Sequence, residues 1–134
     1  MTEEKYPTVF DRIKAAATDV AVIIVLEIIV TFIFFAFVIK TDHAPILILV
    51  FIFFLYDPLF TSIFGGTMGH LMVGIRVKRE SNETKNILFP LAILRFIVKV
   101  SLGWISLFTV SGNAKRKAIH DYLVGSVVVY GKRL

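Results

Sequence analysis

Charged side chains interrupt the long apolar stretches of this sequence at Asp19, Glu27, Arg95 and Lys99. A charged group near the centre of a bilayer costs about 2.5–3.5 kcal/mol on insertion scales, so it rarely faces lipid. Buried carboxylates beside basic groups can carry a proton or a cation through a membrane, or they can simply hold helices together. These residues are therefore the first candidates for a substrate- or ion-binding site.

The depths of these charges match in pairs if both segments enter the membrane from the same side. At about 1.5 Å per residue, Asp19 lies roughly 6 Å and Glu27 roughly 18 Å past an entry at Ala15. Arg95 and Lys99, which share one helix face, lie roughly 10 Å and 16 Å past the start of their stretch. We expect Asp19 to pair with Arg95 and Glu27 to pair with Lys99.

Three apolar stretches must position these charges: residues 15–39, 44–64 and 87–110. The first has about 25 residues, enough to cross roughly 30 Å of hydrocarbon as a helix. The second contains Asp57-Pro58, where we expect the helix to kink or break. The first two stretches are predicted to form a helical hairpin.

The composition predicts a membrane protein, since 57% of the residues are hydrophobic and Phe occurs 13 times. A soluble domain of this length has too little interior volume for so many large apolar side chains. The net charge is +5, and the basic residues flank the apolar segments. This arrangement predicts contacts with anionic lipid and not with nucleic acid. We expect an all-α integral membrane protein with one domain, residues 1–134, in a lipid bilayer.

The basic residues near the segment ends predict the orientation. The amino-terminal arm and the second loop are basic, whereas the first loop carries only Lys40. This predicts a multi-pass protein of the cell (inner or plasma) membrane with a cytoplasmic amino terminus. The tail is also basic, with Lys115, Lys117 and Arg133 among its residues, although three crossings would place it outside.

Two arrangements of the third stretch resolve this conflict. It can cross completely, with the tail charges outside, or it can be re-entrant, turning at residues 101–103 and returning to the cytoplasmic face. Non-helical backbone within a bilayer requires cover by protein or water, which the helical hairpin could provide. The strand-like segments 73–77 and 126–130 favour re-entry, because they could pair if both were cytoplasmic.

The glycine-rich segment 65–70 is not a phosphate loop, because it lacks the spacing and the Lys-Ser/Thr ending of that motif. Its small residues are Gly65, Gly66, Thr67 and Gly69. Gly65 and Gly69 form a small-xxx-small pattern that lets helices approach closely. We expect a role in tight packing or at a helix terminus, and no ligand site.

The histidines do not predict a metal site, because His43, His70 and His120 are scattered over three segments. The chain also has no cysteine, which excludes disulfides and thiolate ligands. His120 adjoins Asp121, but no nucleophile stands in a fitting context, so we expect no enzyme, no catalytic residue and no cofactor. Asp121 is expected to accept hydrogen bonds from Arg12 or from backbone amides.

Several of these residues together resemble the signature of the RDD family of membrane proteins, which is named for one arginine and two aspartates. Arg12 and Asp19 open the first stretch at the spacing of that signature. Asp121, preceded by a basic run and His120, resembles the segment with the second aspartate. Segment 65–70 is similar to the family's Gly-Gly-Thr-x-Gly-Lys element.

The resemblance continues at residues 74–77, similar to a Gly-x-Arg-Val element, and at Arg95, where members often carry arginine. His70 stands where the family pattern has lysine, and Glu27 is not part of the signature. The resemblance implies a small polytopic membrane protein. Transport, including cation/proton exchange, is suggested for some members, and others resemble accessory or assembly factors.

Two functions are compatible with these residues. In the first, the chain is a transporter or a cation/proton exchange component, with Asp19 and Glu27 as binding sites and Arg95 and Lys99 as counter-charges. Two spanning helices cannot enclose a pathway alone, so this function requires a homo-oligomer. In the second, the same charges only lock the fold of a membrane scaffold or accessory subunit.

Overall fold

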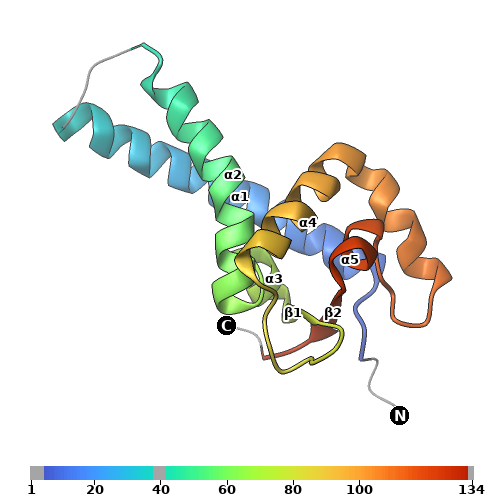
Figure 1. Ribbon diagram of the computed structural model, residues 1–134. Helices are drawn as coiled ribbons and strands as arrows, with labels where there is room; N and C mark the ends of the chain where they lie inside the picture. The colour runs from blue at the N-terminus through green and yellow to red at the C-terminus, as the bar shows by residue number, and fades with distance from the viewer. Residues whose placement is uncertain (1–4, 38–41, 133–134) are drawn as a thin grey trace.

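Two long apolar helices, α1 (Val9–Phe37) and α2 (Ala44–Phe64), form the hairpin that the sequence predicts (Figure 1). The computed structural model describes residues 5–37 and 42–132. The predicted contributions of Lys40 and Arg133 lie outside the described residues. Helices are the expected form of these segments, because lipid offers no partner to an unpaired backbone amide or carbonyl.

The first helix begins six residues before the predicted entry at Ala15, because Thr8 and Asp11 cap it. The backbone amide of Thr8 donates to the Asp11 carboxylate at 3.0 Å, and the amide of Asp11 donates to the Thr8 hydroxyl at 3.3 Å. This reciprocal pattern is a capping box. The second helix has the predicted bounds and continues through the buried Pro58, so the predicted break does not occur.

A short helix and a two-stranded sheet follow the hairpin. Helix α3 (Met68–Val73) leads into β1 (Ile75–Arg79), which pairs antiparallel with β2 (Ser126–Tyr130). The predicted strand pairing is confirmed. The first strand begins two residues later than predicted, because Gly74, with a φ of 85°, ends α3 in the left-handed conformation that glycine tolerates.

The third apolar stretch is bent. Helix α4 (Phe89–Leu102) ends where Gly103 takes a φ of 51°, and the 3₁₀ helix η1 (Gly103–Gly112) continues in another direction (Figure 1). The combined stretch Phe89–Gly112 is long and apolar enough to span a membrane, as are α1 and α2. The bend lies within the predicted turn at residues 101–103.

The tail returns to the end of the hairpin at which the chain begins. Helix α5 (Ile119–Val124) contacts both arms of the bent stretch, and β2 then pairs with β1. The amide of Tyr130 also donates to the carbonyl of Lys5 at 3.1 Å. The arm and the tail therefore share one end of the molecule, as in the re-entrant alternative.

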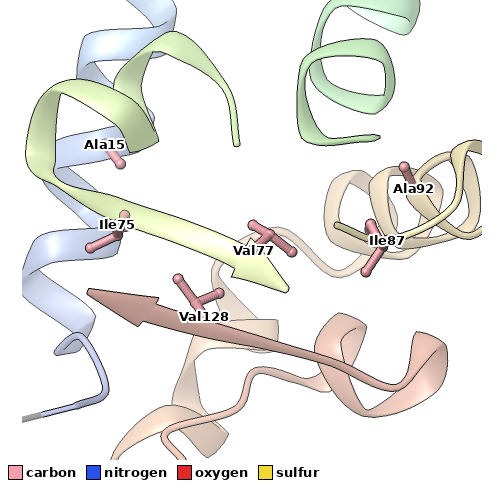
Figure 2. Packing of buried hydrophobic residues seen from close by; sticks show 6 residues of the cluster. All are labelled: Ala15, Ile75, Val77, Ile87, Ala92 and Val128. Atoms are coloured by element: carbon pink, nitrogen blue, oxygen red, sulfur yellow. The ribbon is translucent and has the colours of Figure 1, made fainter. Parts of the chain in front are cut away.

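The well-packed core lies at this same end (Figure 2). It consists of apolar side chains from α1, the sheet, α4 and the loop just before α4: Ala15, Ile75, Val77, Ile87, Ala92 and Val128. The distant half of the hairpin instead exposes large apolar side chains, such as Phe32 and Phe51. This division fits a helical membrane protein with a packed base and a lipid-facing hairpin.

Candidate functional site

Asp121 is the centre of a buried ion-pair network that joins the two ends of the chain. Its side chain is fully buried and lies 2.7 Å from Nη1 of Arg12 and 3.1 Å from Nε of Arg95. The amide of Ala118 and the hydroxyl of Ser126 also donate to it, each at 3.1 Å. Burial raises the pKa of Asp121, but the two guanidinium groups outweigh burial and hold that pKa well below its usual value.

Asp57 on α2 extends this network. Its carboxylate lies 2.6 Å from Nζ of Lys99 and 3.9 Å from Nη1 of Arg95, and it accepts a hydrogen bond of 3.2 Å from Thr61. Arg95 thus stands between Asp57 and Asp121. The network ties α1, α2, α4 and α5 together through five charged residues: Arg12, Asp57, Arg95, Lys99 and Asp121.

Asp19 on α1 has a different environment, although it is also buried. Its carboxylate accepts hydrogen bonds from the hydroxyl of Tyr56 at 2.9 Å, the hydroxyl of Thr67 at 2.5 Å and the amide of Gly69 at 2.7 Å. All three donors are neutral. In the described part of the chain, no lysine or arginine forms an ion pair with Asp19.

The contact between Asp19 and Gly69 requires glycine. A Cβ atom at position 69 would collide with the carbonyl oxygen of Ala15 and lie 2.7 Å from the Asp19 carboxylate. Thr67 caps the amino terminus of α3, and Gly65 ends α2 with a φ of 77°. The prediction that segment 65–70 serves packing and helix termini is confirmed, and Gly66 lies between these caps with a φ of 159°.

A histidine accompanies each centre. Nδ1 of His70 lies 2.5 Å from the Thr67 hydroxyl, and Nδ1 of His120 lies 2.6 Å from the hydroxyl of Ser106. Burial, assisted by nearby Lys99 and Arg95, lowers the pKa of His70 well below its usual value. Burial and the charge of Arg95 lower the pKa of His120 to about 3. Both rings are therefore neutral at pH 7.

The hydrogen bonds of Thr67 fix the direction of proton donation. While Asp19 is ionised, the one proton of the Thr67 hydroxyl is donated to Asp19, so Nδ1 of His70 is the donor in the bond to the Thr67 oxygen. The result is a chain of hydrogen bonds from His70 through Thr67 to Asp19.

Partners of Asp121 and the Asp19 carboxylate itself line one cavity of about 270 Å³. Its polar lining includes Arg12, Asp19, Asp57, Arg95 and Lys99, together with both histidines. Its apolar lining includes Val20, Ile23, Phe53, Phe96, Val100 and Trp104. The site is thus a set of buried charges at the side of a largely apolar cavity between α1, α2, α4 and η1.

The predicted ion pairs within the membrane are wrong. Arg95 pairs with Asp57 and Asp121, and Lys99 pairs with Asp57. The depth estimate assumed straight, parallel segments and omitted the carboxylates of α2 and α5. The third stretch bends, and these omitted carboxylates lie closer to its basic residues than Asp19 does.

Glu27 lies apart from the site. Glu27 does not line the cavity. Its Oε1 accepts a hydrogen bond of 3.0 Å from the hydroxyl of Thr31, one turn further along α1. Its predicted pairing with Lys99 is wrong, because Lys99 has Asp57 as its carboxylate partner.

Sequence reasoning correctly predicted the bond from Arg12 to Asp121. It missed Asp57 because the Asp57-Pro58 pair is interpreted there as a helix kink. The missed signal is the carboxylate itself, since an ionisable residue within an apolar stretch is a functional candidate by default. Asp57 satisfies that criterion as well as Asp19 does.

Within the described ranges, no group of three or more His, Cys, Asp or Glu residues could hold a metal ion. No curated protein and no solved structure matches the chain. The RDD family profile, however, matches residues 6–125, which include Arg12, Asp19 and Asp121. The chain therefore belongs to the RDD family.

Proposed function

We propose that this protein is a proton-coupled membrane transport component, in which Asp19 binds a proton or a competing cation. The observation that carries this proposal is the difference among the three buried aspartates. Asp57 and Asp121 have lysine or arginine partners, whereas the described residues give Asp19 neutral donors. A carboxylate without a fixed counter-charge can exchange its proton or cation with little disturbance of the surrounding ion pairs.

The hydrogen-bond chain to Asp19 supports a proton-transfer role. His70 and Asp19 both line the cavity, and Thr67 connects them. A proton that reaches the free ring nitrogen of His70 can release the proton on Nδ1, which passes through the Thr67 hydroxyl to the carboxylate. In this mechanism, the neighbouring ion pairs supply a fixed electrostatic background.

We propose further that the protein forms a homo-oligomer and has one orientation in the membrane. One chain has a cavity bordered by few helices, so a complete pathway requires further helices, which a homo-oligomer would supply. We place the protein in the cell membrane with its amino terminus in the cytoplasm. The base of the molecule then faces the cytoplasm, where its basic residues can contact anionic lipid headgroups.

Reconstituted liposomes with an internal pH-sensitive dye test this function. An imposed Na⁺ or K⁺ gradient should drive proton movement with the wild-type protein, and Asp19→Asn should abolish that movement. Glu27→Gln is the matched variant, since it neutralises a carboxylate on the same helix outside the cavity, and it should retain proton movement. Equal activity of wild type and Asp19→Asn would contradict the role of Asp19.

A second candidate function is a non-transporting scaffold or accessory subunit. The network of Arg12, Asp121 and Arg95 favours it, because these residues join the first helix to the tail and are buried. If intact wild-type oligomers in liposomes move neither protons nor cations under any gradient, the scaffold function replaces transport.

A further inference from the structure

Two buried guanidinium nitrogens beside the cavity have no hydrogen-bond partner among the described residues: Nε of Arg12 and Nη1 of Arg95. Both arginines line the cavity, and the Arg95 side chain is 2% exposed. Nη1 lies 3.9 Å from the Asp57 carboxylate, beyond hydrogen-bond distance. A buried donor of this kind is costly unless a partner satisfies it.

Lys99 provides a third donor beside the same cavity. Its Nζ lies 2.6 Å from Asp57, and its side chain is 30% exposed. An ammonium group has three N–H donors, and the bond to Asp57 uses one of them. Lys99 can therefore contact a second anion without leaving Asp57.

The charges of the network leave room for an anion. Arg12, Arg95 and Lys99 contribute three positive charges, and Asp57 and Asp121 contribute two negative charges. The excess is one positive charge, which Asp19 balances only while it is ionised. Both neighbouring histidines are neutral, since burial lowers the pKa of each.

The rest of the cavity is apolar and borders on the lipid-facing surface. Val20, Val100 and Trp104 line it and are also 58%, 47% and 68% exposed. Ile23, Phe53 and Phe96 also belong to this apolar wall. In a membrane, these exposed side chains face acyl chains, so a molecule can enter from the bilayer without crossing a polar barrier.

We infer that this cavity binds an amphiphile with an anionic headgroup, a carboxylate or a phosphate, and an unbranched apolar chain. The headgroup bonds to Arg95 and Lys99, and the chain lies along the wall from Phe53 to Trp104. The volume of about 270 Å³ is near the lower end for small-molecule sites, which suits a headgroup and the first part of a chain. Binding does not require transport, so this inference goes beyond the proposed function.

The single tryptophan of the chain offers a readout at the site, because Trp104 lines the cavity. The protein is reconstituted in nanodiscs that contain a small fraction of brominated-chain lipid, which quenches tryptophan fluorescence at contact. Brominated phosphatidylcholine gives the background from ordinary lipid contact. Brominated fatty acid and brominated phosphatidate test the two anionic headgroups, and at least one should quench Trp104 in excess of that background.

Charge-removing variants then locate the headgroup. Lys99→Gln should weaken the selective quenching about fivefold, the effect of one basic residue on an anionic lipid. Arg95→Gln should weaken it about tenfold or more. It removes a fully buried cation from two carboxylates, whereas Lys99→Gln removes a partly exposed cation from one carboxylate, so Lys99→Gln is the decisive variant. Lys14→Gln removes an exposed charge from α1 outside the cavity and should leave the excess unchanged.

Three results would overturn the inference. Equal quenching by phosphatidylcholine and both anionic lipids would show that the cavity does not select anions. An equal loss in Lys14→Gln and Lys99→Gln would show diffuse surface attraction. Displacement of the brominated lipid by inorganic phosphate alone would show a site for a simple anion without a chain.

Discussion

The centres around Asp121 and Asp19 contain buried carboxylates of the same signature, but their partners differ in charge. Asp121 has two arginines and two neutral donors, whereas the donors to Asp19 among the described residues are the hydroxyls of Tyr56 and Thr67 and one amide. Two guanidinium charges favour the ionised form of Asp121, whereas neutral donors give Asp19 hydrogen bonds without a counter-charge. The first centre is therefore built to stay ionised and fixed.

The residues of the family signature therefore have two different roles. Arg12 and Asp121 connect the start of the first helix to the tail, which holds the ends of the chain together. Asp19 shares the helix with Arg12 but bonds to α3, which the glycine at position 69 brings into contact with α1. One arginine and one aspartate thus form the structural pair, and the other aspartate is the residue to which we assign proton or cation exchange in the proposed function.

The largest expected effect comes from breaking the structural pair. Arg12→Ala leaves Asp121 buried with Arg95 as its remaining cation, and removal of one partner from a buried pair costs about 3–5 kcal/mol. The free energy of unfolding in detergent micelles, measured with a denaturant, should fall by this amount. Glu83→Gln, which breaks the exposed pair with Lys5, should change it little. Similar values for both variants would refute the structural role.

A more gradual effect is expected from pH, through the two histidines, because it is spread over several pH units. The pKa of His120 in the folded protein is about 3, below the ordinary 6.5. As the pH falls, His120 is therefore protonated in the unfolded chain before it is protonated in the folded protein. The stabilisation is complete above pH 6.5 and is lost as the pH falls towards 3, by about 1.4 kcal/mol per pH unit for one group.

His120→Asn should therefore reduce the slope of stability against pH between about 6.5 and 4 by one proton. His70→Asn should have the same sign, because burial also lowers the pKa of His70. Denaturant unfolding of each variant at several pH values gives the slopes. An unchanged slope in His120→Asn would mean that this ring is already protonated in the folded protein.

The smallest of these effects concerns the contact between the Asp19 centre and α3. Gly69→Ala forces α3 away from Ala15 and Asp19, which should cost about 1–3 kcal/mol as overpacking does. Gly112→Ala is the control, because no atom lies within 4 Å of the Cβ position there. If Gly69→Ala were as stable as Gly112→Ala, the tight approach of α3 to Asp19 would not exist in solution.

The sequence predicts several helices and strands and one contact of the site, the bond from Arg12 to Asp121. The bounds of α2 and β2 follow from continuous apolar and β-branched runs, and the bond from Arg12 to Asp121 followed from charge and position. These features depend on local composition or on a strong opposite-charge pair. Hydropathy and propensity therefore suffice to predict them.

The pairing of the remaining charges could not be predicted, because it depends on tertiary geometry. The bend at Gly103 and the position of α5 bring Asp121 to Arg95, and depth along straight helices contains neither feature. The donors to Asp19 come from α2 and α3, segments whose approach depends on a single glycine. Periodicity gives the face of a helix, and it does not say which neighbour covers that face.

The most direct test of the division between Asp19 and Asp121 is infrared difference spectroscopy of the purified protein across a pH step. The carbonyl stretch of a protonated carboxylic acid reports which aspartate gains a proton. We expect this band to appear in the wild type and to be missing in Asp19→Asn, while Glu27→Gln retains it. A band that persists in Asp19→Asn would mean that another carboxylate takes the proton, and the proposed division of the signature would be wrong.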